Sequence, residues 1–147
     1  MSNSIVGLDS LIKKLDKLGG NAEEAVKKSM QKNILLVKNE AKMLCPVAEN
    51  KGGDLRDSIS KQTVVRKGSI KGIVYTNSDH AAYVEFGTGI RGQSSNSNTE
   101  VNVTYKQDWS GMEAQPYLYP ALKNNKDRVL NEIEKDVRKA IREVARR

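Results

Sequence analysis

The sequence has very few of the residues that build disulfides and metal sites. Its 147 residues include one cysteine, Cys45, and one histidine, His80. A single cysteine cannot form an internal disulfide, and His80 has no second histidine with which to share a metal. We expect Cys45, which precedes Pro46 at the end of a helical pattern, to be a small buried apolar residue. We therefore predict no metal and no cofactor.

Long apolar runs and aromatic residues are also scarce. No apolar run approaches the roughly 20 residues that a membrane span needs, and we expect no cleavable leader and no membrane partner. Only 37% of the residues are hydrophobic and 5% are aromatic, so the core should be thin and mainly aliphatic. These features predict a single soluble domain over residues 1–147 that matures in a reducing cytoplasm.

The charge is basic but mixed. The formal net charge is +7, from 25 Lys and Arg against 18 Asp and Glu. A basic protein can contact nucleic acid or an acidic protein partner. Here basic and acidic residues alternate along the expected helices, which is typical of a solvated face. We do not expect specific nucleic-acid binding, and we keep a basic nucleic-acid-binding module that uses the C-terminal helix as the alternative function.

Two long helices are expected from apolar periodicity. From Ala22 to Leu44 the apolar residues recur at helical spacing on one face: Val26, Met30, Ile34, Val37, Ala41 and Leu44. Leu35, Leu36 and Met43 widen this stripe, so the helix should bury more than one side. Pro120 suits the first position of the last helix, because its missing N–H would have no partner there. The stripe of that helix is Leu122, Val129, Ile133, Val137, Ala140 and Val144, and a shorter helix is expected over 8–18.

Between these helices the sequence predicts a β-hairpin. Residues 58–66 and 73–76 alternate and contain β-branched residues, and residues 67–69 supply the turn. We expect residues 100–106 either to pair with this hairpin or to form one arm of an extended loop. Residues 89–100 are rich in Gly, Ser and Asn and should form a mobile loop. The predicted fold is α+β, a small antiparallel sheet packed by the helix at 22–44 and the long C-terminal helix.

The central stretch, residues 78–89, predicts a two-turn helix, with a strand at 83–86 as the alternative. Ser78 or Asp79 can cap its start. Ala82 and Phe86 lie four residues apart on one face, and Gly87 can take the left-handed conformation that closes a helix. We expect these residues to form a structural core motif: Ala82, Phe86 and Gly87, together with Pro116 and Pro120.

No catalytic constellation is recognisable. Asp79 and Glu85 are six residues apart and would point in different directions on a helix. In a phosphate-binding loop, the glycines come directly after a strand and lead into a helix. Gly87, Gly89 and Gly92 are not expected to have that arrangement. We predict that the protein is not an enzyme.

Three motifs carry a resemblance to a known family. They are AYVEFGT at 82–88, GDLRDSI at 53–59 and GMEAQPYLYPAL at 111–122, and the opening GLDSL at 7–11 is similar to the usual start of the family. The chain resembles tailed-bacteriophage neck proteins, the head–tail joining or tail-completion proteins of siphophages and their prophages. The resemblance implies a structural minor tail protein that joins the tail to the head connector or completes the tail end.

The resemblance also implies partners and a location. Family members of this kind work as rings, commonly sixfold, so we expect the chain to bind itself as a hexamer. Its other expected partners are neck and tail proteins, namely the connector or stopper and the tail tube. The implied location is the virion, after assembly in the cytoplasm of the bacterial host.

Five residues are candidates for interfaces. Glu85 is either an exposed helix charge or the partner of an arginine, Arg56 or Arg91, within the subunit or across to a neighbour. Tyr105 and Trp109 flank the expected loop. They can pack in the core, but an aromatic residue on a loop is also a common interface anchor.

Overall fold

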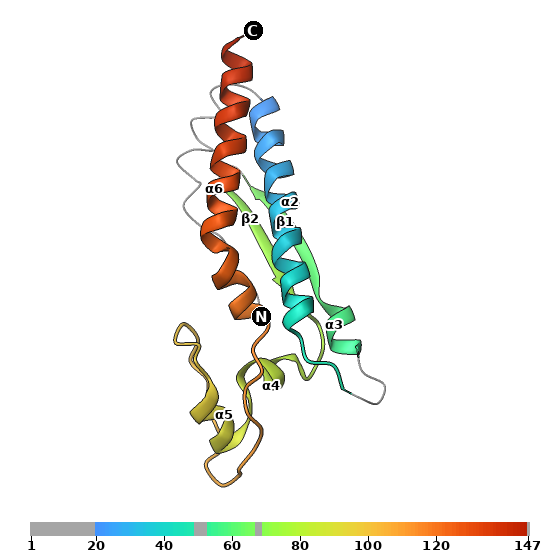
Figure 1. The fold of residues 1–147 in the computed structure, drawn as a ribbon, viewed down its shortest axis with the longest axis vertical. Coiled ribbons are helices and arrows are strands. Elements are labelled where there is room, and N and C mark those ends of the chain that lie inside the picture. The colour runs from blue at the N-terminus through green and yellow to red at the C-terminus, as the bar shows by residue number, and fades with distance from the viewer. Residues whose placement is uncertain (1–19, 49–52, 67–68, 147) are drawn as a thin grey trace.

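The computed structural model describes residues 20–48, 53–66 and 69–146 of the chain. Along the sequence the elements are α2 (Gly20–Leu44), α3 (Asp54–Ser58), β1 (Ser60–Arg66), β2 (Ser69–Tyr75), α4 (Ala81–Phe86), α5 (Gly89–Ser95) and α6 (Leu118–Ala145). The fold is α+β, as predicted, with two long helices and a small antiparallel sheet (Figure 1). The helix expected over 8–18 and the turn at 67–68 lie outside the described residues.

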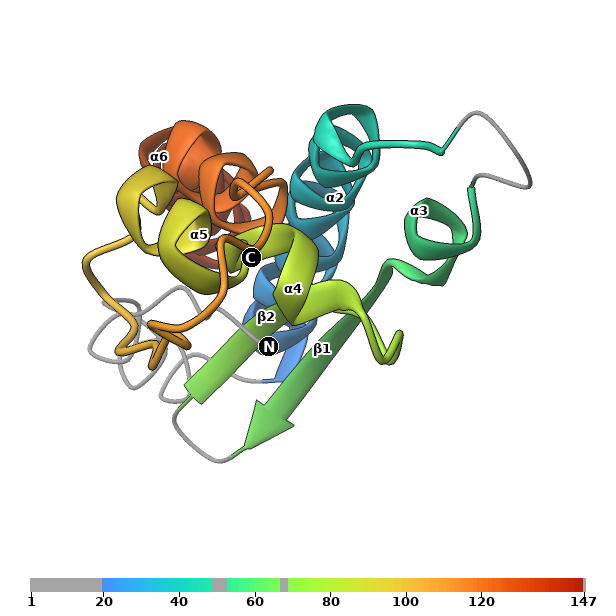
Figure 2. The ribbon, with the colours of Figure 1, turned by 90° about the horizontal axis from the view of Figure 1, so that it is seen from below.

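The helices α2 and α6 lie side by side and run in opposite directions (Figure 1, Figure 2). Most of the predicted stripes are confirmed, because these residues are buried: Val26, Met30, Ile34, Val37 and Ala41 on α2, and Val129, Ile133 and Val137 on α6. Polar contacts at two places, around Asp136 and around Glu40, tie the helices together. The Ser29 hydroxyl donates to Asp136 Oδ2 over 2.5 Å, and the Asn125 amide donates to Glu40. Because buried polar groups need partners, these pairs help to fix the alignment of the helices.

One side of α2 differs from the expectation. Leu35, Met43 and Leu44 are exposed, so the prediction that the buried stripe reaches Leu44 and widens over Leu35 and Met43 is wrong. Leu35 and Met43 are eight residues apart, about two helical turns, and therefore share a face. That face is turned away from the two layers, α6 and the hairpin, that α2 contacts. Met43 is 84% exposed, which leaves an apolar side chain available at the end of α2.

The sheet is the predicted hairpin. β1 pairs antiparallel with β2 in a register that places Thr63 opposite Gly72. The face formed by Ile70, Gly72 and Val74 packs on α2. A Cβ at Gly72 would come within 2.7 Å of Met30 Sδ, so this glycine lets the helix lie close to the sheet. Residues 100–106 contain no strand, and among the described residues the sheet has two strands. Of the two alternatives for this segment, pairing with the hairpin is therefore wrong, and residues 103–106 lie beside α4 instead.

Residues 81–116 form a distal lobe that projects beyond the end of the helix pair (Figure 1). The lobe contains α4, α5 and the irregular segment 96–116. Gly89–Ser95, which were expected to belong to a loop over 89–100, form the helix α5 instead. The Ile90 N–H donates to the Trp109 carbonyl over 3.0 Å, and long-range bonds of this kind make up for the poor helix propensity of the segment. The mobility of residues 89–100 stays a prediction.

Candidate interaction surface

A buried carboxylate joins the distal lobe to α6. Glu85 lies on α4, and its side chain reaches the start of α6, where the first N–H groups of a helix have no intrahelical partners. Glu85 Oε2 accepts hydrogen bonds from the backbone N–H groups of Tyr117 (2.8 Å) and Leu118 (3.0 Å). Its Oε1 accepts a hydrogen bond from the backbone N–H of Tyr119 (2.8 Å). The next residue, Pro120, has no N–H. Of the four backbone positions at the helix start whose N–H would lack an intrahelical partner, three therefore bond to Glu85, and the fourth is a proline without an N–H.

The start of α6 and the Glu85 carboxylate are electrostatically complementary. The N-terminus of a helix carries a partial positive charge, and a carboxylate there is stabilising. Glu85 is only 1% exposed, so water screens this interaction little. Burial, and then the negative charge of Glu85, raise the pKa of the neighbouring Tyr117 well above its ordinary value, so its hydroxyl stays protonated. The Tyr117 hydroxyl donates to the Ala81 carbonyl at 3.5 Å, a second and longer link between α4 and the start of α6.

The expectations for Glu85 need correction. It is neither an exposed helix charge nor the partner of an arginine within the described chain. Arg56 instead pairs with Asp57 at 3.9 Å, and Arg91 pairs with Glu113 at 3.5 Å. The helix start takes up the carboxylate completely, so we no longer propose Glu85 as an interface residue. Arg56 and Arg91 are exposed, and their interface role stays a prediction.

The corner after α4 depends on Gly87. Its φ of 72° and ψ of −177° belong to a region that residues with a side chain rarely adopt. The positive φ was expected, but the conformation is not the left-handed helical one that we predicted. A Cβ at Gly87 would lie 2.6 Å from both the Ala114 nitrogen and the Met112 oxygen. The next residue, Thr88, exchanges two backbone hydrogen bonds with Met112, at 2.9 and 3.0 Å, so the glycine allows these two segments to pair.

The rest of the predicted core motif is confirmed only in part. The helix at 81–86 exists, but its N-cap is His80, and no side chain caps it, contrary to the expectation for Ser78 or Asp79. Phe86 is buried. Ala82 and Pro116 are exposed, so their assignment to the core is wrong. Pro120 is the third residue of α6 instead of the first, because the helix begins at Leu118, whose N–H donates a hydrogen bond to Glu85.

One flank of the distal lobe carries an apolar groove of about 510 Å³, which we call the aromatic groove. Its walls come from α4, from the corner at 87–89 and from residues 103–109, and include Ala82, Tyr83, Phe86, Tyr105, Lys106 and Trp109. Tyr83 is 59% exposed and Trp109 is 53% exposed. The Tyr105 hydroxyl donates to the Phe86 carbonyl over 2.8 Å, which holds the groove walls together. The structure thus brings Tyr105 and Trp109 into one groove, and their role in binding stays a prediction.

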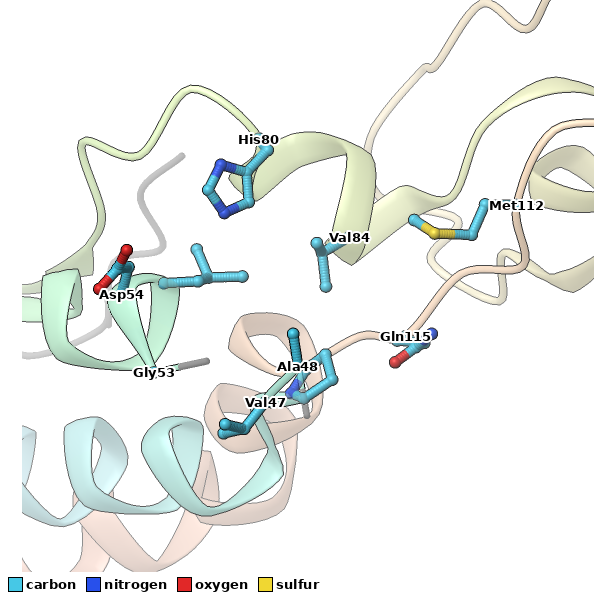
Figure 3. Close-up of a pocket in the computed structure, with 10 residues that line it drawn as sticks. Val47, Ala48, Gly53, Asp54, His80, Val84, Met112 and Gln115 are labelled. Atoms are coloured by element: carbon cyan, nitrogen blue, oxygen red, sulfur yellow. The ribbon is translucent and has the colours of Figure 1, made fainter. Parts of the chain in front are cut away.

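A second hollow, of about 570 Å³, lies between α3, α4 and residues 46–48, which follow the end of α2. Figure 3 shows its walls, with His80 and Val84 facing Val47, Ala48 and Asp54 across the space. We call it the corner hollow. Leu55, Val84 and Met112 line it, and each comes from a different one of the three motifs that carry the resemblance. Sequence reasoning missed this hollow because its lining comes from segments that are far apart in the chain.

The described residues around the two hollows do not include the grouped ligands that a metal ion needs. Among the described residues, no three His, Cys, Asp or Glu side chains are grouped so that they could hold a metal ion. Cys45 is buried as predicted, and burial raises the pKa of its thiol, although the positive charge of Arg56 opposes this shift. In the part of the chain that the structure describes, no helix is both long and apolar enough to cross a membrane.

Comparison with protein families gives the class of the protein. Residues 9–87, more than half of the chain, match the HK97-gp10-like family of bacteriophage tail components. The matched range contains the motif at 53–59 and nearly all of the motif at 82–88. The chain belongs to this family, and it is a structural component of a phage tail. Searches of curated proteins and of solved structures each found no match.

Proposed function

We propose that this tail component acts at the neck, where it completes the tail end or joins it to the head connector. The observation that carries the proposal is the distal lobe, which is fastened to the helical body by Glu85 and carries Tyr83 and Trp109 exposed beside an apolar groove. Exposed aromatic side chains around a hollow mark a binding surface. Membership of a tail-component family makes a protein of the assembled tail, which includes further copies of this chain, the expected occupant.

The subunit acts as one member of a closed ring in this proposal, and six is the number that we propose. A tail is built around an axis, so a subunit that repeats around it uses two different patches in a head-to-tail contact whose rotation closes. Along the axis, the ring would contact the connector or stopper on one side and the tail tube on the other. The protein works by binding alone, without turnover, in the virion after assembly in the host cytoplasm.

Deletion of the gene tests this function. A phage or induced prophage without the protein should produce filled heads and tails that do not become joined, infectious particles. Electron microscopy of the lysate would count joined and separate particles, and supplying the protein in trans should restore joining. Normal numbers of joined, infectious virions from the deletion strain would refute a role in the neck.

A further inference from the structure

The distal lobe has apolar surfaces on two opposite flanks. Both ribbon views place α4 between α5 on one side and α3 on the other (Figure 1, Figure 2). The aromatic groove lies on the α5 flank, between α4 and residues 103–109. The α3 flank holds the corner hollow and the end of α2. A subunit with different apolar patches on opposite flanks is suited to head-to-tail association.

The α3 flank offers a protruding apolar group. Met43, Leu44 and Val47, which we call the corner ridge, are all exposed, and Val47 also lines the corner hollow. A methionine side chain is flexible and makes favourable contacts between its sulfur and aromatic rings. The aromatic groove offers the matching recess, with the rings of Tyr83 and Trp109 at its walls. Ridge and groove are therefore both apolar, and the methionine of the ridge suits the aromatic rings of the groove.

The charges beside the two patches are also complementary. Lys106 is the one charged residue among the described residues that line the aromatic groove. Asp54 is the one carboxylate among the described residues around the corner hollow. Within the described part of the chain, neither side chain has an ion-pair partner. Opposite charges at the rims of two patches set the register of a contact and disfavour wrong partners.

We propose that the aromatic groove of each subunit receives the corner ridge of a second copy of this chain, with Asp54 of one copy opposite Lys106 of the next. This inference rests on the proposed ring and specifies its contact. Each subunit contributes its groove to one neighbour and its ridge to the other, so the same contact repeats around the ring. Glu85 would hold the lobe in the orientation that the contact needs.

Cross-linking tests the contact without removing its anchors. In a Cys45→Ala background, Val47→Cys places a thiol on the ridge and Ala82→Cys places one in the groove, at an exposed position. A short bis-maleimide should give covalent dimers when rings contain both variants, and none when rings contain either variant alone. A ladder of higher multimers should appear when one chain carries both cysteines. Lys139→Cys, exposed on the far part of α6, replaces Ala82→Cys in the control and should not link to Val47→Cys.

Charge reversal gives a second, independent measurement. Lys106→Glu and Asp54→Lys should each lower the association constant of the ring at low salt roughly tenfold, because each places like charges at the contact. The chain with both changes should recover most of the loss, since every contact then has the reversed pair. Asp57→Lys is the matched control, because Asp57 lies on the same helix and does not line the corner hollow. Combined with Lys106→Glu it should restore nothing.

The outcomes separate this inference from the proposed function. Light scattering and electron microscopy report whether rings form, and thermal melting of each variant reports whether the subunit is folded. Rings that form without the mixed cross-link and without rescue by the double reversal would overturn the contact and leave the ring intact. Cross-links within a single-cysteine variant would also overturn it, because they indicate a face-to-face contact. If no ring forms in the isolated protein or in assembled particles, the ring and the contact both fail.

Discussion

The role of Glu85 can be tested with a change of one heavy atom. Glu85→Gln keeps the size of the side chain but replaces one carboxylate oxygen with an amide NH₂ group. The three N–H groups at the start of α6 point at both oxygens, so in the variant at least one N–H faces another donor. A buried donor without a partner costs about 1–3 kcal/mol. The variant also loses the attraction between the negative charge and the helix terminus, about 1–2 kcal/mol in a partly buried site.

One effect opposes these losses. Burying a carboxylate is itself costly, and the neutral amide avoids that cost. We therefore expect a net decrease of about 2–3 kcal/mol in the free energy of unfolding, less than the sum of the two losses. For a chain of this length, that corresponds to a decrease of roughly 5–10 °C in the melting temperature.

Urea denaturation followed by circular dichroism would measure this difference. The matched control is Glu134→Gln, which removes the exposed ion pair with Arg138 on the surface of α6. Exposed pairs of this kind contribute about 0.3–0.5 kcal/mol, so the control should remain close to the original protein. Equal stability of the Glu85→Gln variant and the control would refute the conclusion that this carboxylate joins the lobe to α6.

Three further changes test the lobe and its junction. Phe86→Ala should lower the free energy of unfolding by about 3–5 kcal/mol, because it empties a buried aromatic site, and an unchanged urea midpoint would contradict this. Gly87→Ala should cost about 3 kcal/mol or more from backbone strain and close contacts, and the same titration measures it. Because the pKa of Tyr117 is raised above its ordinary value of 10.0 in the folded state, the unfolded state loses this proton first. Stability should therefore fall as the pH rises above about 10, and Tyr117→Phe should make that fall shallower in denaturant titrations.

The helical body could be predicted from the sequence because local spacing determines which side chains share a face. Val26, Met30 and Ile34 recur at helical spacing, and they are buried as that spacing indicates. The hairpin could be predicted in the same way, from alternating side chains on both sides of a short turn. Periodicity does not reveal how wide the covering layer is, so Met43 was assigned to the buried side although nothing in the described structure covers it.

The distal lobe could not be predicted, because contacts between distant residues organise it. Glu85 meets residues 117–119, which are 32 to 34 positions further along the chain. Thr88 pairs with Met112, 24 positions away. In sequence, residues 89–95 are too rich in Gly and Ser to indicate a helix, and their order comes from these contacts. In the sequence this junction appears only as a glutamate and a distant segment that ends in Pro120, which is too weak a signal to predict that the two meet.

The three motifs that carry the family resemblance meet at the corner hollow, which Leu55, Val84 and Met112 line. The motif at 53–59 supplies α3, the motif at 82–88 supplies Glu85 and Gly87, and the motif at 111–122 supplies the segment that pairs with Thr88 and the helix start that receives the carboxylate. The motifs at 82–88 and 111–122 therefore build and fasten the lobe, and Leu55 of the motif at 53–59 lines the corner hollow beside it. The aromatic groove draws equally on the motif at 82–88 and on residues 103–109, which lie outside all three motifs. A contact at this groove therefore uses residues of one family motif together with residues outside all three motifs.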